Sequence, residues 1–308
     1  MRSWNKKSIS IILVICMAVG LTFYLLSGHA FAQSPGPATT LSFPAGRLEI
    51  HYLCIGQADS TFIKLPNGQT MLIDAGLPLN SNHVTGGERI VQYIRSLGVN
   101  TIDYLIVTHP HYDHIAAIPS VIDAFEIQNI FMPDITHTTQ AFVRVLDAIE
   151  RNGLTIQTVQ AGDELFNFAG LRANFAAPNS QRYRNLNNYS IVTRLEYGGK
   201  YFLFMGDAEA IVENEILEAG HGIAADVIMA GHHGSNTSST LPFLQAVSPQ
   251  IAVISVGSGN SYGHPHTEVL DRLAALGVDV YRTDLDGTIV IIYHNGNLSV
   301  QRTGRSVL

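Results

Sequence analysis

The 308-residue chain contains little cysteine, which limits how its fold can be held together. There are two cysteines, and Cys16 lies in an apolar N-terminal segment, so Cys54 stands alone in the rest of the sequence. That remainder cannot form an internal disulfide, although a domain of this size does not need one. Leu48, Ile50 and Tyr52 precede Cys54 at every second position and would share one face of a strand with it. We expect Cys54 to be a buried small hydrophobic residue.

Positive charge is also scarce. The chain has 18 Lys and Arg against 25 Asp and Glu, for a formal net charge of −7. Without residues 1–32, which hold three positive charges and no acidic residue, the charge is −10. Tight binding to long nucleic acid regardless of its sequence requires an excess of Lys and Arg. The charge balance argues against such binding without excluding a nuclease.

Repeats, low-complexity tracts and a second linker are absent between residues 47 and 302. Charged residues make up 14% of the chain and hydrophobic residues 46%, a composition that folds rather than stays disordered. We predict one α/β domain over residues 47–302. It follows a flexible linker over residues 33–46, which is rich in Pro, Gly, Ser and Thr.

The N-terminus has the three parts of a secretory signal. Positive residues precede an almost wholly apolar run over residues 9–26, and a small-x-small cleavage site ends at Ala32. We predict a signal peptide over residues 1–32, cleaved before Gln33, and a secreted, cell-surface or periplasmic protein. The alternative is an uncleaved anchor, in which residues 9–26 would be the sole contact with the membrane.

Apolar periodicity predicts strands first and then an alternation of strands and helices. Strands are expected over residues 48–55, 60–65, 69–73, 102–107, 130–132, 171–175, 190–197, 200–205, 226–229, 251–255, 279–281, 288–293 and 298–301. Helices are expected over residues 88–97, 115–125, 138–152, 208–219 and 267–276. Two mixed sheets with helices outside them pack naturally as a four-layer αββα sandwich.

The strongest functional motif is Thr108-His109-Pro110-His111-Tyr112-Asp113-His114, between a predicted strand and a predicted helix. Three imidazoles and one carboxylate lie within six positions, and together these ligands suit Zn, Mn or Fe. A loop at a strand end can direct alternate side chains inward. His109 and His111 would then bind one ion, and Asp113 and His114 a second. The alternative is a polar loop with histidines there by chance.

Two further strand ends carry potential ligands. Gly206-Asp207 ends one apolar strand, and its carboxylate could bridge the two ions. Such a pair alone is more often a turn, so this interpretation depends on the first motif. Gly231-His232-His233-Gly234-Ser235 ends another apolar strand. We assign the ligand role to His232, and a supporting or substrate-contacting role to His233.

These motifs together resemble the metallo-β-lactamase superfamily, and the likeness extends over nearly all of the chain beyond residue 32. It implies a metal-dependent hydrolase. It also implies that Asp74, in Leu72-Ile73-Asp74-Ala75-Gly76, orders the ligand loop without binding an ion itself. The alternative for Asp74 is a turn residue after a strand.

Five short strings, in order, are similar to the C-terminal domain of ComEC-type competence proteins. They are Gly56-Gln57-Ala58-Asp59-Ser60, Asn187-Asn188-Tyr189-Ser190, His232-His233-Gly234-Ser235, Tyr262-Gly263-His264-Pro265 and Tyr281-Arg282-Thr283-Asp284-x-x-Gly287. That domain is regarded as a nuclease, and the likeness extends to secreted phosphodiesterases that act on cell-wall phosphocholine. This sequence lacks the polytopic membrane channel of ComEC-type proteins, so we do not expect it to transport DNA.

One ligand common in the superfamily is missing. A histidine usually precedes the Gly-Asp pair, where this sequence has Asn188 and Ser190, as the ComEC-like pattern also does. The first ion would then be held by His109, His111, Asp207 and solvent, with Asn188 as a further contact. A more oxygen-rich site suits Mn comparatively well, so we expect two divalent ions, Zn or Mn.

The resemblance implies hydrolysis by a metal-bridging hydroxide, because two ions about 3.5–4 Å apart lower the pKa of the water they share. Asp113 and His264 are the candidate catalytic residues, with His264 as general acid or phosphate contact. Arg182 and Arg184 could contact a phosphodiester. The alternative for His264 and both arginines is a solvated loop residue.

Three functions fit these observations. We favour an exported phosphodiesterase or nuclease that acts on a short nucleic acid or a cell-wall phosphodiester, without a stable protein partner. The second is a metal-dependent hydrolase of a lactone, β-lactam or thioester. The third is a non-enzymatic metal-binding surface module, against which the nearly complete ligand set argues.

Overall fold

The computed structural model describes residues 46–304, except residues 80–81, 169 and 221. The predicted signal segment and the predicted linker up to residue 45 lie outside the described residues. Among the helices that are described, none combines the length and the apolar character needed to cross a membrane.

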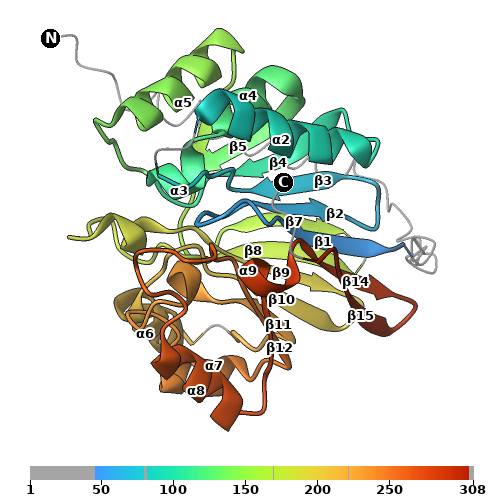
Figure 1. The fold of residues 1–308 in the computed structure, drawn as a ribbon, viewed down its shortest axis with the longest axis vertical. Helices are drawn as coiled ribbons and strands as arrows, with labels where there is room; N and C mark the ends of the chain where they lie inside the picture. The colour runs from blue at the N-terminus through green and yellow to red at the C-terminus, as the bar shows by residue number, and fades with distance from the viewer. Residues whose placement is uncertain (1–45, 80–81, 169, 221, 305–308) are drawn as a thin grey trace, which may run out of the picture. The chain divides into compact units, whose positions relative to one another are not determined.

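The strands of the described chain form two mixed sheets (Figure 1). The first has eight strands in the order β15-β14-β1-β2-β3-β4-β5-β6. They are β1 (Leu48–Tyr52), β2 (Thr61–Lys64), β3 (Thr70–Ile73), β4 (Thr101–Ile106), β5 (Glu126–Met132), β6 (Ile156–Thr158), β14 (Ile289–His294) and β15 (Asn297–Arg302). The second has seven in the order β13-β12-β11-β10-β9-β8-β7. They are β7 (Glu164–Phe168), β8 (Leu171–Ala177), β9 (Val192–Tyr197), β10 (Lys200–Phe204), β11 (Val227–Met229), β12 (Ile251–Ile254) and β13 (Asp279–Arg282).

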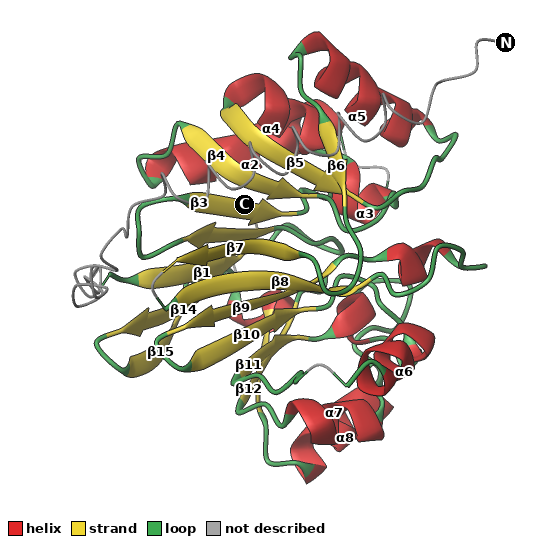
Figure 2. Cartoon of the chain, turned by 180° about the vertical axis from the view of Figure 1, so that it is seen from behind, coloured by secondary structure: helices red, strands yellow, loops and turns green. Residues whose placement is uncertain are grey.

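Helices cover the outer face of each sheet and complete four layers (Figures 1 and 2). The first sheet carries α2 (His83–Ser96), α4 (Ile118–Ala124) and α5 (Gln140–Arg151). The second carries α6 (Ala210–Glu218), α7 (Leu241–Val247) and α8 (Thr267–Ala275). Short helices lie in loops: α3 (Tyr112–Ile115), η1 (Leu186–Tyr189), η2 (Gly231–Gly234) and α9 (Thr283–Asp286). The predicted αββα sandwich is confirmed.

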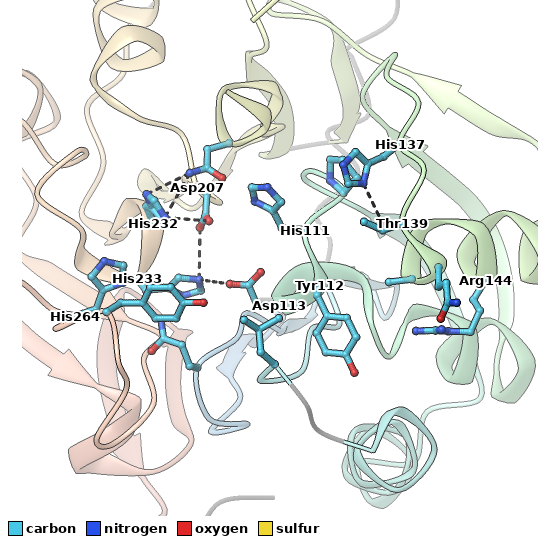
Figure 3. A pocket seen from close by; sticks show the side chains of 17 residues that line it. His111, Tyr112, Asp113, His137, Thr139, Arg144, Asp207, His232, His233 and His264 are labelled. Carbon is cyan, nitrogen blue, oxygen red and sulfur yellow. Dashed lines mark hydrogen bonds and ion pairs between the residues drawn. The ribbon is translucent and has the colours of Figure 1, made fainter. Parts of the chain in front are cut away.

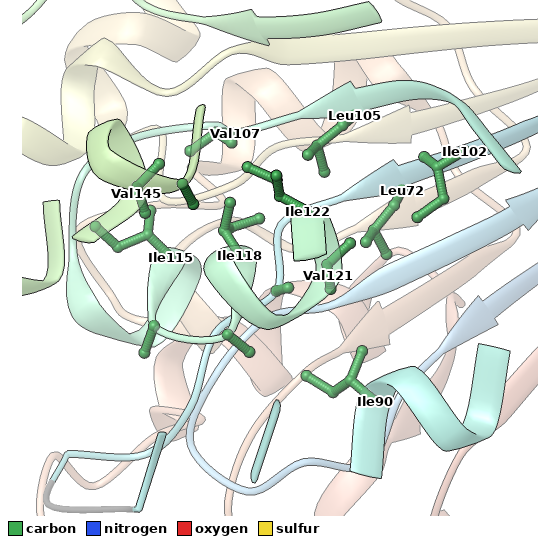
Figure 4. Packing of buried hydrophobic residues seen from close by; sticks show 14 of the residues in the cluster. Leu72, Ile90, Ile102, Leu105, Val107, Ile115, Ile118, Val121, Ile122 and Val145 are labelled. Carbon is green, nitrogen blue, oxygen red and sulfur yellow. The ribbon is translucent and has the colours of Figure 1, made fainter. Parts of the chain in front are cut away.

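Three apolar clusters hold the layers together, one between each pair of neighbours. The middle cluster includes Leu48, Ile50 and Tyr52 of β1, whose alternation directs them between the sheets. An outer cluster joins the first sheet to its helices (Figure 4), and a second joins the other sheet to its own. Cys54 is buried as expected, but it follows the end of β1, and its thiol donates to the carbonyl oxygen of Thr283.

The helix expected over residues 115–125 is found as the shorter α4, and Ile115 instead ends the separate helix α3. Pro119 lies in the first turn of α4. Proline is accepted there because it lacks only an N–H that has no helical partner, but it cannot sit in the interior of a continuous helix. The break leaves α3 as a single turn that presents the second half of the histidine motif.

Candidate metal centre

Four strand ends supply most residues of the centre. Asp74 follows β3 and the histidine motif follows β4, while Asp207 follows β10 and the paired histidines follow β11. β3 pairs with β4 in parallel, as β10 does with β11, so the carboxyl ends of each pair lie together. Side chains from both sheets converge on one pocket as a result (Figure 3).

The first group of potential ligands contains His109, His111 and Asp207, with ligand atoms that all lie within 4.8 Å of one another. Nε2 of His109 lies 2.9 Å from Nδ1 of His111 and 3.6 Å from Oδ2 of Asp207. Two ring nitrogens this close either share a hydrogen or converge on a cation. His109 and Asp207 are buried, whereas His111 is half-buried at the pocket.

The second group contains Asp113, His114, Asp207 and His233, also within 4.8 Å. Nε2 of His233 lies 3.2 Å from Oδ2 of Asp113 and 3.7 Å from Oδ1 of Asp207. Nε2 of His114 lies 3.2 Å from the same Asp207 oxygen. Asp207 thus belongs to both groups, and it offers a different oxygen to each.

Unpartnered atoms at the centre test whether these residues fit a metal. Nε2 of His114, Oδ1 of Asp207 and Oδ1 of Asp59 are buried without a hydrogen bond of acceptable geometry. Most buried polar atoms have a partner, so such atoms require an explanation. The first two are convergent ligand atoms of the second group, and a cation placed between them would satisfy both. The donor set therefore fits divalent metal.

The paired histidines have different surroundings. The sequence assigns the ligand role to His232, but His233 is the member of the second group. His233 is 2% exposed, and its Nδ1 lies 2.9 Å from the carbonyl oxygen of Ser255. The side chain of His232 is 22% exposed, and its Nδ1 lies 3.0 Å from Oγ1 of Thr237. The geometry favours His233 as the ligand in the second group and leaves His232 at the pocket wall, with its Nε2 3.7 Å from Oδ2 of Asp207.

Three residues at the centre have left-handed backbone angles. Asp74, His232 and His233 have φ angles of 59°, 51° and 53°. The left-handed region costs a residue with a Cβ about 1–2 kcal/mol. Such strain persists where the surrounding structure imposes it, and it is characteristic of functional sites. Two successive left-handed residues turn the chain sharply after β11, which explains why sequence spacing could not tell which imidazole faces inward.

Asp74 supports the ligand loop through three contacts. Its carboxylate accepts the backbone N–H of Thr108 at 2.7 Å and the hydroxyl of Thr108 at 2.6 Å. Its Oδ2 also lies 2.7 Å from Nδ1 of His114. Burial raises the pKa of Asp74. Burial would lower the pKa of His114, but Asp207 and Asp74 outweigh it and hold that pKa well above the usual value.

Asp59 is a member of the centre that the sequence analysis did not single out. Its Oδ1 lies 3.2 Å from Nδ1 of His233, and its carboxylate forms a third acidic and histidine group with Asp74 and His114. Its backbone N–H donates to the carbonyl oxygen of Asp113 at 2.9 Å. Asp59 belongs to the Gly56–Ser60 string that resembles ComEC-type proteins. A single Asp in a turn, however, does not indicate which residue its carboxylate contacts.

The pocket beside the centre has a volume of about 590 Å³. The potential ligands that line it are His111, Asp113, Asp207 and His233, with His232 and His264 beside them. Other lining residues are Gln57, Leu79, Pro110, Tyr112, His137, Thr139, Gln140, Ala141, Arg144, Asn187 and Tyr262. Asp113 and His264, the candidate catalytic residues, therefore share the pocket.

Three predicted contacts lie elsewhere. Arg182 and Arg184 are exposed and do not line this pocket. Asn188 is buried, and its amide donates to Glu209 at 3.0 Å, so it is engaged away from both ligand groups. Its neighbour Asn187 lines the pocket instead, with Nδ2 3.4 Å from the ring nitrogens of His232.

His264 is packed among aromatic rings at the pocket wall. Its ring centroid is 5.6 Å from that of Tyr262 and 5.5 Å from that of His232. Nδ1 of His264 is buried without a partner. Burial, together with nearby His232 and His233, lowers the pKa of His264 to about 4.

The fold and this strand-end arrangement of ligands agree with a known family. Residues 55–258 match the model of the metallo-β-lactamase superfamily, and the chain belongs to that superfamily. The solved metallo-β-lactamase fold protein YhfI from Bacillus subtilis superposes with a TM-score of 0.52 and 10% identity. The match covers 83% of this chain and 100% of that one, and it shows the shared fold.

Curated relatives confirm the resemblance to ComEC-type competence proteins. ComE operon protein 3 of Bacillus subtilis is 32% identical over 82% of this chain and 34% of its own length. Competence protein ComA of Neisseria gonorrhoeae is 29% identical over 80% of this chain and 32% of its own. This chain thus spans about a third of the length of these relatives.

Proposed function

We propose that the protein is a metal-dependent phosphodiesterase or nuclease with a two-ion centre. The observation that carries the proposal is the pair of ligand groups that share Asp207. The first ion would be held by His109, His111 and Asp207, and the second by Asp113, His114, Asp207 and His233. Because the set mixes imidazole with carboxylate, Zn and Mn are the ions that suit it best.

The chain's own residues define what the centre can do. Divalent ions held here would supply Lewis acidity and a water-derived nucleophile at neutral pH. Asp74 and Asp59 hold the rings of His114 and His233 in place, which keeps their opposite nitrogens directed into the centre. Asp113 lines the pocket and is the more exposed of the two carboxylates in the second group.

His264 is better suited to contact the phosphate than to act as a general acid. Its pKa of about 4 means that the ring is neutral near pH 7 and holds few protons to transfer. A neutral imidazole can still donate one hydrogen bond. The His264 ring lines the pocket, where it can donate that hydrogen bond to a substrate oxygen.

Support for a phosphodiester rather than another bond comes from the relatives and from the pocket. ComA is named for competence, and a further relative, Recombination protein 2 of Haemophilus influenzae, is named for recombination; both are processes of nucleic acid. Arg144 and several imidazoles line the pocket, and the acids that line it belong to the ligand groups. A net charge of −10 beyond residue 32 opposes long DNA, so we propose a short nucleic acid or another small phosphodiester as substrate.

A substrate panel tests the class of reaction. The protein, reconstituted with Mn or Zn, is assayed on bis-p-nitrophenyl phosphate, single-stranded DNA, nitrocefin and a lactone. We expect cleavage of the phosphodiesters with little turnover of the other two. Efficient hydrolysis of nitrocefin or the lactone, with both phosphodiesters intact, would overturn the proposal and favour the second function.

Metal content provides an independent check. We expect close to two ions per chain by elemental analysis, and Asp207→Asn should lose metal and activity together because both groups depend on this carboxylate. Asp226→Asn is the control, since that carboxylate accepts from Lys200 and Tyr201 away from the centre. A stable single ion at saturating metal would contradict the shared role of Asp207.

We also propose that the protein is exported, on the basis of the signal-like residues 1–32. N-terminal sequencing of protein from its native host should then begin near Gln33. Recovery of Met1 in a soluble cytoplasmic fraction would contradict export.

A further inference from the structure

The pocket has a second wall that the proposed ion centre does not use. It is formed by α5 and the segment before it, through His137, Thr139, Gln140, Ala141 and Arg144. Figure 3 places Arg144 at the end of the pocket away from Asp207, with Tyr112 between the two ends. This wall is referred to below as the α5 wall.

Arg144 is a cation without a partner in the described part of the chain. Its Nε is buried and makes no hydrogen bond. The acidic residues that line the pocket, Asp113 and Asp207, are both members of the ligand groups. The Arg144 side chain lines the pocket, where an anionic ligand would give this cation a partner. Arg151 of the same helix, by contrast, pairs with Asp123 at 2.8 Å.

The start of α5 adds a second feature that favours an anion. The side chain of Thr139 caps the helix by accepting the N–H of Phe142 at 3.4 Å, and the N–H groups of Gln140 and Ala141 precede the first helical hydrogen bond. All three residues from Thr139 to Ala141 line the pocket. The positive end of the dipole of this 12-residue helix therefore opens onto the same space as the Arg144 guanidinium.

We propose that the α5 wall is a subsite for a second phosphate group of the substrate, while the ion centre holds the phosphodiester that is cleaved. This inference rests on the proposed function and specifies its substrate. A planar guanidinium binds phosphate through two parallel hydrogen bonds, and the helix start offers further N–H donors. Tyr112, between the two ends, and Leu79, which also lines the pocket, provide apolar surface for the sugar or base that links the phosphates.

The second phosphate can come from two sources, the next phosphodiester of an oligonucleotide or a terminal phosphate. Four substrates separate them: bis-p-nitrophenyl phosphate, a thymidine dinucleotide, the same dinucleotide with a 5′-phosphate, and a trinucleotide without terminal phosphate. Arg144→Gln should raise KM by about 10–100-fold for each substrate that places a phosphate on the α5 wall. It should leave kcat/KM of the first two within about twofold.

Two variants control for structural damage. Arg151→Gln removes a charge from the same helix outside the pocket and should affect no substrate. Arg144→Lys keeps the charge but not the forked pair of donors of the guanidinium. It should therefore raise KM less than Arg144→Gln does, but still above the wild-type value. The subsite would be overturned if Arg144→Gln raised KM equally for all four substrates, or raised it for none of them.

Binding distinguishes failure of the subsite from failure of the proposed function. If the wild type cleaves none of the four substrates, the phosphodiesterase proposal falls. Calorimetric titration of the metal-free protein with the 5′-phosphorylated dinucleotide then tests the α5 wall alone. A Kd that Arg144→Gln weakens by at least about tenfold supports the subsite. Equal Kd values, or no binding to the wild type, overturn it.

Discussion

Nδ1 of His114 lies 2.7 Å from Oδ2 of Asp74, and this contact directs the opposite ring nitrogen of His114 toward Asp207. Replacing the carboxylate by an amide of the same shape should leave the ring free to turn. We predict that Asp74→Asn weakens metal binding by about 10–100-fold. Competition with a chelating dye measures the affinity.

Asp103 is a close control for Asp74. It accepts the backbone N–H and the hydroxyl of Thr70, just as Asp74 does with Thr108, but at the far end of β4 from the centre. Asp103→Asn should therefore destabilise the fold locally and leave metal affinity unchanged. Equal affinities of the Asp74 variant and the wild type would remove the positioning role.

The paired histidines should behave differently when each is truncated. His233→Ala is expected to lose the second ion, because His233 belongs to that ligand group and His232 does not. His232→Ala should keep the wild-type metal content, although it can slow turnover through the pocket wall. Elemental analysis of both variants decides between them, and the opposite pattern would restore His232 as the ligand.

Gly76 allows two loops of the centre to approach closely. A Cβ at this residue would overlap the carbonyl oxygen of Asp113, so the backbone of the ligand loop would have to move. We predict that Gly76→Ala costs about 1–3 kcal/mol of unfolding free energy and also weakens metal binding. Gly222→Ala, where nothing lies within 4 Å of the new Cβ, is the control in urea unfolding. Wild-type metal affinity in Gly76→Ala would show that the loop tolerates the shift.

Acid should destabilise the protein partly through His51. Burial lowers the pKa of His51, and Glu49 offsets this only in part. The unfolded chain then binds a proton below about pH 6.5 that the folded chain takes up only at lower pH, so this stability is present above pH 6.5 and is lost as pH falls. His51→Gln should flatten the decline in unfolding free energy from about pH 6.5 to 5. His294 is exposed, so His294→Gln should leave this decline unchanged. If His51→Gln showed the same decline as the wild type, His51 would not contribute to the loss of stability in acid.

The sandwich could be predicted because its main strands have clear apolar runs and their order follows a simple alternation. The elements that were not foreseen carry weak signals. β6 and β7 are short and mostly exposed or half-buried, so apolar periodicity does not mark them. α7 spans seven residues and has a proline in its first turn. Such elements are stabilised by tertiary contacts and have no clear apolar periodicity of their own.

The centre divides in the same way. His109, His111, Asp113, His114 and Asp207 could be found from sequence because strand ends and close spacing bring them together. The inward-facing member of the histidine pair could not, because it depends on two left-handed backbone angles. Arg144 could not either, because a single arginine on a helix carries no sign of which cavity it faces. The sequence pointed instead to Arg182 and Arg184 as phosphate contacts, because they precede the asparagine pair in sequence. Neither of them lines the pocket.

The pairing of β1 with β14 has a consequence for the order in which the domain can form. Leu48 pairs with Tyr293, so β1 gains one of its two neighbours only after the intervening residues 53–288 have been synthesised. Until then, one edge of β1 exposes unpaired N–H and carbonyl groups, which are prone to pair with other chains. Contacts this distant in sequence also form slowly. The nascent chain must therefore keep that edge protected until residues 289–302 have emerged, and removal of β14 and β15 would expose this edge of β1.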